Sequence, residues 1–284
     1  MSFSVNTNVN SLDAQRNAAS TQMSLSTSIQ RLSSGLRVNS AKDDAAGLSI
    51  ATRMDAQARG MNVAIRNAND GVSLLQTAES GMSTVSDMLQ RMRELTVQAT
   101  NATNTSADIN SLNQEYTQLS QEVGRTISAV QFNGQTLLTN SSTTGLDFQV
   151  GANAGQTINV GSATLNLDQS SVSSVLSGGT NAASSLNINS AASNSANLAA
   201  IDSALQAVND ARANIGAAQS RFQNTVSFLQ SAAENQTAAK GRIMDADFAS
   251  ETANLSRAQI LQQAGTAMIA QANQLPQGVL SLLK

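Results

Sequence analysis

Several residue types are absent or nearly absent from this chain of 284 residues. It contains no cysteine, which excludes disulfides and thiolate metal sites. It also contains no histidine, the commonest general base and metal ligand. With no tryptophan, one tyrosine and six phenylalanines, it lacks the large side chains that usually fill the core of a globule of this length. We therefore expect a protein that is not an enzyme and that holds no metal or cofactor.

Charge and proline are scarce as well. The net charge is only −3, and the 16 lysines and arginines are scattered, so no basic patch predicts nucleic-acid binding. No run of about 18 apolar residues is long enough to cross a membrane, and the first residues lack the pattern of a secretory signal peptide. A single proline, Pro276, leaves long helices almost uninterrupted. We expect neither a nucleic-acid nor a membrane partner.

Both ends of the chain carry a helical pattern. Residues 1–36 and 248–280 place apolar residues at alternating three- and four-residue spacing, as in an amphipathic helix with a heptad-like stripe. Neither stripe can bury its apolar face alone. We therefore predict that residues 1–40 and 245–284 pack on each other and on neighbouring subunits, and are largely disordered in the free monomer. The stripe positions are Val5, Val9, Leu12, Ile29, Leu32 and Leu36 in the first segment, and Leu261, Met268, Leu275 and Val279 in the second.

The patterning leaves the number of associating chains open, because heptads specify association but not stoichiometry. A head-to-tail contact between copies that does not close on itself would give a helical filament. Stripes that pair only within one chain would instead seal a monomeric bundle. Both alternatives fit the pattern of the two ends.

Between the ends, further helices are predicted. One covers about residues 45–100, and the polar run 100–106 then forms a turn that supplies the N-cap of the next helix. That helix ends in a turn at residues 131–135, and a long helix resumes at Leu198. With these segments the fold is mainly α, and we expect an elongated antiparallel helical rod with coiled-coil-like paired termini.

The middle of the chain has a different composition. Residues 140–197 are mostly Ser, Thr, Asn, Gly and Ala, with short alternating pieces at 145–151 and 156–160 that predict a small β-hairpin region. The stretch 181–197 is typical of a loop. The sequence therefore divides into a terminal helical domain (1–44 with 243–284), a helical rod domain (45–139 with 198–242) and a short variable region (140–197).

Short motifs at both ends carry a family resemblance. They are the segments 5–9 (VNTNV), 31–37 (RLSSGLR), 41–48 (AKDDAAGL), 256–265 (SRAQILQQAG), 270–274 (AQANQ) and 279–284 (VLSLLK). These motifs closely resemble those of bacterial flagellin, and the match covers roughly residues 1–140 and 198–284 in the expected order.

The resemblance implies the structural subunit that self-assembles into the bacterial flagellar filament for swimming motility. Such a chain is secreted unfolded through the flagellum's own type III export apparatus and becomes extracellular. Its paired termini would form the inner tubes of the filament. Implied partners are further copies of itself, the filament cap and hook–filament junction proteins, and an export chaperone on residues 245–284.

Two relatives of the filament subunit are alternatives. A hook–filament junction protein shares the terminal motifs but departs from them more, so the near-complete motifs here favour the filament subunit. A peptidase-bearing flagellin would need histidine for its zinc motif, and the chain has none.

One segment of the predicted second helix is a candidate recognition site. Its residues at i, i+3, i+4 and i+7 share one side of the helix, and one of them also belongs to the neighbouring buried stripe of Met92, Leu95 and Ala99. The four are Arg91, Glu94, Leu95 and Gln98, with Leu95 at the boundary.

The family resemblance gives this segment a role. It resembles the flagellin site for a host toll-like receptor, with Arg91 and Leu95 as the main contacts and Glu115 on the adjacent helix. The same surface should also serve subunit packing in the filament. The leucine-rich C-terminal tail resembles the part of flagellin that cytosolic inflammasome sensors detect.

Two close carboxylate pairs could be mistaken for a catalytic or metal site. They are Asp43 with Asp44 and Asp245 with Asp247. Both pairs lie beside predicted helix starts, where carboxylates stabilise the positive end of the helix dipole. Because the chain has neither histidine nor cysteine, we interpret them as helix-start residues.

Overall fold

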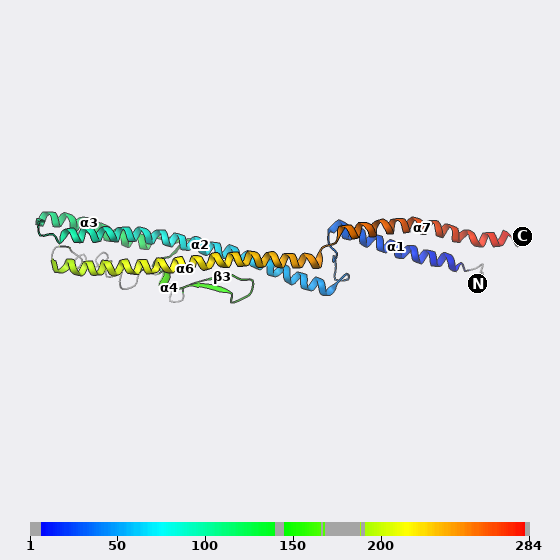
Figure 1. The fold of residues 1–284 in the computed structure, drawn as a ribbon, viewed down its shortest axis with the longest axis horizontal. Helices are drawn as coiled ribbons and strands as arrows, with labels where there is room; N and C mark the ends of the chain where they lie inside the picture. Colours follow the sequence, from blue (N-terminus) through cyan, green and yellow to red (C-terminus); the bar gives the residue numbers. More distant parts are fainter. Residues whose placement is uncertain (1–6, 140–144, 166, 168–187, 189–190, 282–284) are drawn as a thin grey trace. The chain divides into compact units, whose positions relative to one another are not determined.

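The computed structural model describes residues 7–139, 145–165, 167, 188 and 191–281. Within these residues the fold is mainly α, as predicted (Figure 1). The chain divides into two compact units, Met1–Ala56 with Glu234–Lys284, and Gln57–Ala233. The predicted three-part division of the sequence stays a prediction. The helices are α1 (Val9–Ser34), α2 (Ala45–Ala99), α3 (Ser106–Ala129), α4 (Ser162–Leu165), α6 (Ala191–Met244) and α7 (Phe248–Ser281).

In the first unit, α1 and α7 lie side by side and run antiparallel (Figure 1). The side chain of Asn8 accepts a hydrogen bond from the Ser11 amide and so caps the start of α1. Gly35 ends the helix in the left-handed region, with φ of 72°, and its amide donates to the carbonyl of Arg31. The helix therefore ends two residues before Leu36, the last position of the predicted apolar stripe.

A backbone junction follows both helices. The amide of Arg37 donates to the carbonyl of Met244 at 2.6 Å, and the amide of Ala246 donates to the carbonyl of Gly35 at 2.9 Å. Beside these bonds, Val38, Met244 and Ala51 form a small buried cluster on which Leu36 packs. The junction therefore joins the chain after α1 to the chain before α7.

The second unit contains the main hydrophobic core, built by α2, α3, α6 and the small strands. Thr105 and Asp108 form a reciprocal capping box at the start of α3, which confirms the predicted N-cap. Arg93 on α2 forms an ion pair of 2.7 Å with Asp202 on α6, and the side chain of Gln219 on α6 donates to Glu79 on α2. Because the lower residue number on α2 pairs with the higher one on α6, the two helices run antiparallel here. The largest fully buried side chains are Tyr116, Phe222, Leu75, Met82, Leu89, Met92, Leu95, Leu137, Leu138, Leu167, Ile188 and Ile201.

The predicted β-hairpin is confirmed. Strands β3 (Leu146–Gln149) and β4 (Thr157–Val160) pair antiparallel, with Phe148 opposite Ile158. The ring of Phe148 meets that of Phe222 edge-on at 5.4 Å, which fixes the hairpin on the helical core.

A second hairpin lies where the sequence predicted only a turn. Strands β1 (Gln131–Phe132) and β2 (Gln135–Thr136) are joined by Asn133 and Gly134, whose φ angles are 50° and 79°. Positive φ at both central residues is the requirement of a type I′ turn, and Asn-Gly is its preferred sequence. The dipeptide was therefore a hairpin signal that the turn prediction did not use.

The loop predicted over residues 181–197 is wrong for its last seven residues. Helix α6 already begins at Ala191, seven residues before the predicted start at Leu198. Asn194 and Asn197 are buried on it, and the side-chain amide of Asn194 donates to the hydroxyl of Thr100 at 3.3 Å. Tertiary contacts therefore outweigh the weak helix propensity of this Ser- and Asn-rich segment. Most of the remaining loop prediction lies outside the described residues.

Two phenylalanines on α6 test where the core lies. Phe222 is fully buried, whereas Phe228 is 70% exposed. We expect Phe222→Ala to lower the free energy of unfolding by about 3–5 kcal/mol, because it removes the ring beneath the hairpin and leaves a cavity. The matched variant Phe228→Ala should change it by less than about 0.5 kcal/mol. Urea titration followed by circular dichroism measures both, and equal losses would contradict the assigned core.

Candidate assembly surface

The contact between α1 and α7 is made mostly by small and polar residues. On both helices the less exposed positions recur at alternating three- and four-residue steps, as in a coiled-coil seam. We call these positions the seam. They are Ser11, Ala14, Ala18, Thr21, Leu25, Ser28 and Leu32 on α1, and Glu251, Leu255, Ala258, Gln262, Gly265, Ile269 and Ala272 on α7.

Close approach and side-chain hydrogen bonds hold the seam. A Cβ atom built on Gly265 would lie 3.6 Å from the Cβ of Ala18, an ordinary van der Waals contact. The Ser11 hydroxyl donates to the Asn273 side chain at 2.7 Å, and the Asn8 side chain donates to the carbonyl of Ala272 at 2.8 Å. The two helices therefore pack closely while burying few large apolar groups.

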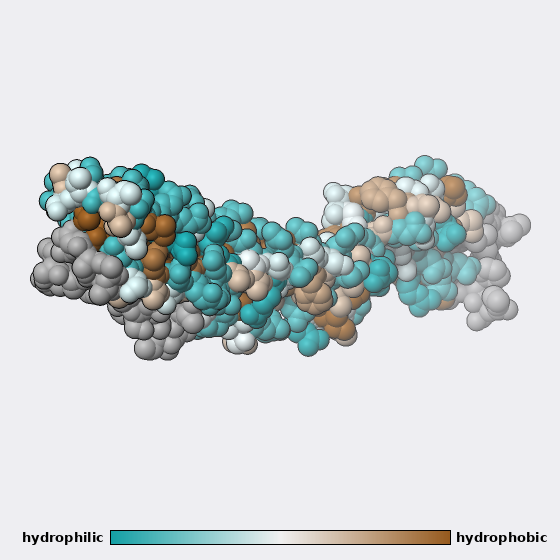
Figure 2. Space-filling view, turned by 60° about the vertical axis from the view of Figure 1, so that its left-hand side comes forward, coloured by the Kyte–Doolittle hydropathy of each residue, from teal (hydrophilic) through white to brown (hydrophobic). Residues whose placement is uncertain are grey.

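Leu25, Leu32, Leu255 and Ile269 belong to the seam, but the other large apolar side chains described on α1 and α7 lie outside it. Figure 2 shows such residues, in tan and brown, among the hydrophilic ones on the surface. Every one of these side chains on the terminal helices is more than half exposed. They are Val9, Leu12, Met23 and Ile29 on α1, and Phe248, Ile260, Leu261 and Met268 on α7.

The predicted stripes are therefore split by the structure. Five of the ten stripe positions stay on the surface: Val9, Leu12, Ile29, Leu261 and Met268. Leu32 is half-buried in the seam, and Leu36 packs on the junction cluster. Val5 and the side chains of Leu275 and Val279 lie outside the part of the chain that the structure describes. The surface positions do not join α1 to α7, because the small residues beside them allow a closer approach.

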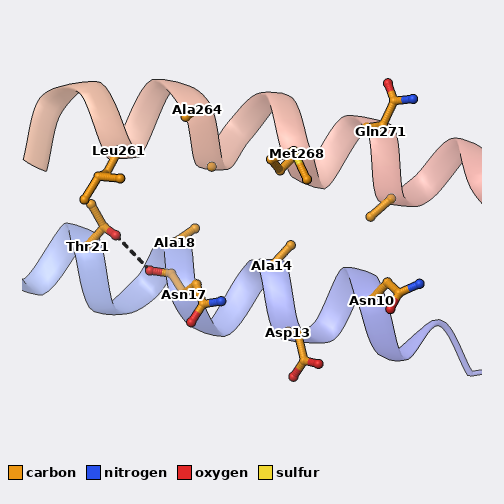
Figure 3. Close-up of a pocket in the computed structure, with 12 residues that line it drawn as sticks. Asn10, Asp13, Ala14, Asn17, Ala18, Thr21, Leu261, Ala264, Met268 and Gln271 are labelled. Carbon is orange, nitrogen blue, oxygen red and sulfur yellow. Dashed lines mark hydrogen bonds between the residues drawn. The ribbon is translucent and has the colours of Figure 1, made fainter.

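An open groove of about 590 Å³ runs beside the seam. Figure 3 shows Leu261 and Met268 from α7 and Ala14 and Ala18 from α1 along it. Asp13 is the one charged residue of its lining. We call this hollow the seam groove. Its lining is completed by Asn10, Asn17, Thr21, Ala264, Gly265, Gln271 and Ala272.

One carboxylate of each close pair caps a helix start, as interpreted. Asp44 accepts the Gly47 amide at 2.7 Å at the start of α2, and Asp247 accepts the Ala249 amide at 3.0 Å at the start of α7. The hydroxyl and amide of Ser40 donate to Asp43 and lower the pKa of that carboxyl. In the part of the chain that the structure describes, no three such side chains form a potential metal site, and no helix is long and apolar enough to cross a membrane.

The second candidate surface lies on α2 and α3. The guanidinium of Arg91 donates to Glu115 at 2.9 Å and to Glu94 at 3.0 Å. These hydrogen bonds, that to Glu94 first, raise the pKa of Arg91. Gln98 is also exposed. The structure thus brings four of the five predicted recognition residues to one surface.

Leu95 is the exception in this group. Its side chain is 0% exposed and lies in the core cluster that also contains Met92. Leu95 was predicted to belong both to the exposed face and to the buried stripe, and the structure places it in the buried stripe alone. Because α3 and α6 both pack on α2, the buried face of α2 is wider than one heptad stripe implies.

Most of the seam was missed by the predicted stripes, which share Leu32 with it. Its spacing is as regular as that of the predicted stripes, but its residues are mostly Ser, Ala, Gly, Thr and Gln. A search for large apolar residues cannot find such a seam. The available signal was the regular recurrence of small residues on both terminal helices, at Ala14, Ala18 and Ala258 for example.

The paired terminal helices thus expose large apolar side chains in one of the two compact units of this helical chain. A model of the bacterial flagellin N-terminal helical region matches residues 5–143, and one of the flagellin C-terminal helical region matches residues 198–283. The chain belongs to the bacterial flagellin family. As a member it is a structural component of the extracellular flagellar filament, which self-assembles, and it is not an enzyme.

Individual relatives match along the whole chain. A flagellin of Halalkalibacterium halodurans is 43% identical, with 99% of each chain covered. A flagellar filament 33 kDa core protein of Treponema phagedenis is 39% identical, again with 99% of each covered. The crystal structure of Bacillus cereus flagellin is 30% identical, covering 62% of this chain and 94% of that chain with a TM-score of 0.48.

Tyr116, next to Glu115, gives a prediction about pH. Its ring is buried, burial raises its pKa to about 12, and among the described residues its hydroxyl has no hydrogen-bond partner. A folded-state pKa above the unfolded value of 10 stabilises the fold below pH 10, and this contribution is lost as the pH rises toward 12. Over this pH range the wild type should therefore lose on the order of 2 kcal/mol more of its free energy of unfolding than Tyr116→Phe loses. Denaturant titrations at pH 9 to about 12 measure the difference, and parallel pH profiles would contradict it.

Proposed function

We propose that this flagellin polymerises by burying the exposed apolar side chains of α1 and α7 against neighbouring copies. The observation that carries the proposal is the composition of the seam, which leaves Leu12, Met23, Leu261 and Met268 in solvent. Full burial of such a side chain contributes about 1.5–3 kcal/mol. A few of them on each copy therefore supply a large driving force for assembly that the isolated chain leaves unused.

The same composition supports folding of the ends on assembly. A seam of small and polar residues gives little stability, and isolated helices are marginal in water. Residues 1–40 and 245–284 are then largely disordered in the free monomer and become ordered when neighbours cover their apolar faces. Trypsin should cut at Arg31 and Arg257 in dilute monomer and spare both in the filament. Equal protection in the two states would contradict this.

The exposed faces of α1 and α7 would also bind other proteins, before assembly and at the two ends of the filament. The exposed face of α7, with Ile260, Leu261 and Met268, supports binding of an export chaperone on residues 245–284, which would prevent early polymerisation. A chain without cysteine cannot crosslink during unfolded export through the flagellum's type III apparatus. The filament cap and the hook–filament junction proteins would meet the same α1 and α7 surfaces at the two ends of the filament.

Microscopy separates the filament subunit from the alternative, a hook–filament junction-type protein. Both would carry paired terminal helices, but only the filament subunit adds indefinitely to its own kind. We expect the purified protein to form long filaments when seeded with short filament fragments, as seen by negative-stain electron microscopy. Growth that stops after one layer, or no growth at all, would favour the junction-type protein.

The exposed Arg91, Glu94, Gln98 and Glu115 support a second function, recognition by a host toll-like receptor. Arg91 and its two carboxylate partners come from two helices and form a polar surface that a receptor could bind through ion pairs and hydrogen bonds. Leu95 would act only by supporting this surface from the core. The leucine-rich tail is a further proposed ligand, for inflammasome sensors.

Receptor recognition is tested by one substitution with a matched control. Arg91→Ala should reduce receptor signalling at least about tenfold in a reporter cell, the loss expected when one side of a charged contact is removed. Arg125→Ala removes an exposed arginine that also pairs with a carboxylate three residues away, Glu122, and should signal normally. If Arg91→Ala changes neither signalling nor filament formation, both roles of this surface are wrong.

A further inference from the structure

We propose that the filament contact joins two different surfaces, the seam groove of one copy and the outer face of α1 of the next. This outer stripe consists of Val9, Leu12, Arg16, Ala19 and Met23. The inference rests on the proposed function, because it states which surfaces meet when the chain polymerises. The occupant of the groove is therefore a second copy of this chain.

The two surfaces lie on different sides of α1. A helix turns by about 100° per residue, so Leu12 and Ala19 lie roughly opposite Ala14, which lines the groove. A contact between unlike surfaces leaves a free groove on one copy and a free stripe on the other. Such a contact cannot form a symmetric dimer, and when its rotation does not close into a ring, repeating it builds an open helical polymer.

The dimensions of the two surfaces agree. Along α1 the groove extends from Asn10 to Thr21, about 17 Å at 1.5 Å per residue. The outer stripe extends from Val9 to Met23, about 21 Å. Small residues such as Ala14 on the groove wall leave room for the branched and long side chains of the stripe.

The charges of the two surfaces are complementary. Arg16 is the one charged residue of the outer stripe, and Asp13 is the one charged residue lining the groove. Within one chain they form an ion pair of 2.7 Å, but their side chains are 78% and 53% exposed. Such an exposed pair contributes little to stability. The carboxylate of Asp13 points away from α7 at the rim of the groove (Figure 3), where Arg16 of the next copy can approach it from solvent.

Charge reversal with mixing tests the contact. In Arg16→Glu the stripe repels the groove of an identical copy, and in Asp13→Arg the groove repels the stripe. Each variant alone should need at least about tenfold more protein than wild type to polymerise on seeds. An equimolar mixture should polymerise near the wild-type concentration, since each stripe then meets an opposite charge in the groove of the other variant.

Each variant carries two like charges at positions 13 and 16 of its own chain. Mixing the variants therefore cannot restore the ion pair within a chain, and a rescue must come from contacts between chains. As a control, Arg257→Glu reverses a charge on α7 outside both surfaces, and it should not restore Asp13→Arg. If the mixture is no better than the single variants, or if these polymerise like wild type, the proposed contact is wrong. If wild type itself forms no filaments, the proposed function fails instead.

Cysteine cross-linking provides a second measurement, because the natural chain has no cysteine. Val9→Cys, Leu12→Cys or Met23→Cys, copolymerised with Leu261→Cys or Met268→Cys, should give disulfide-linked heterodimers in oxidised filaments for at least one pair. Each single variant alone should give none. Ile260→Cys is the matched control, since Ile260 is 66% exposed and Met268 61%, yet only Met268 lines the groove. Filaments without a heterodimer from any of the six pairs would overturn the proposal.

Discussion

The close contact between α1 and α7 is the constraint on which the rest of this structure depends. Two helices can approach so closely only where small side chains face each other, as Ala18 and Gly265 do. The seam therefore contains mostly small and polar residues, and most of the large apolar residues described on α1 and α7 lie on its outside. This arrangement is consistent with the family's capacity to assemble. Mostly small residues pair α1 with α7, and most of the large apolar side chains of these helices stay exposed to neighbouring copies.

The second compact unit shows the opposite arrangement. Its core contains Tyr116, Phe222 and a continuous set of Leu, Met, Ile and Val side chains that are almost completely buried. Capping at Thr105 and the edge-on contact of Phe148 with Phe222 complete a unit that satisfies its own hydrophobic surface. The two parts of the chain therefore differ in where their apolar surface is buried, and this difference relates the fold to its role in a polymer.

Much of this fold could be predicted from the sequence. The 3.6-residue pattern gave the long helices, the turn residues before Ser106 gave the capped start of α3, and the alternating pieces gave the β3–β4 hairpin. The early start of α6 could not be predicted, because local sequence does not reveal that Asn194 and Asn197 are buried or that Asn194 bonds to the distant Thr100. Leu95 was misplaced for a related reason, since local spacing does not reveal that two other helices cover α2.

The candidate site was predicted only in part. The apolar stripes were found because their residues are large, and the terminal motifs resembled those of flagellins. Most of the seam was not found, since Ser11, Ala14 and Gly265 carry no hydrophobic signal of their own. A periodic pattern of small residues has meaning only once it is known that a second helix approaches it, and that knowledge comes from the paired structure.

Amide hydrogen exchange tests most directly the claim that the ends depend on neighbours. In dilute monomer, amides of α1 and α7 should exchange almost as fast as in an unfolded chain, while those around Tyr116 and Phe222 stay protected. In the filament, protection of α1 and α7 should rise to that of the core. Strong protection of both terminal helices in the monomer would contradict the account, since the seam would then hold them without a neighbour.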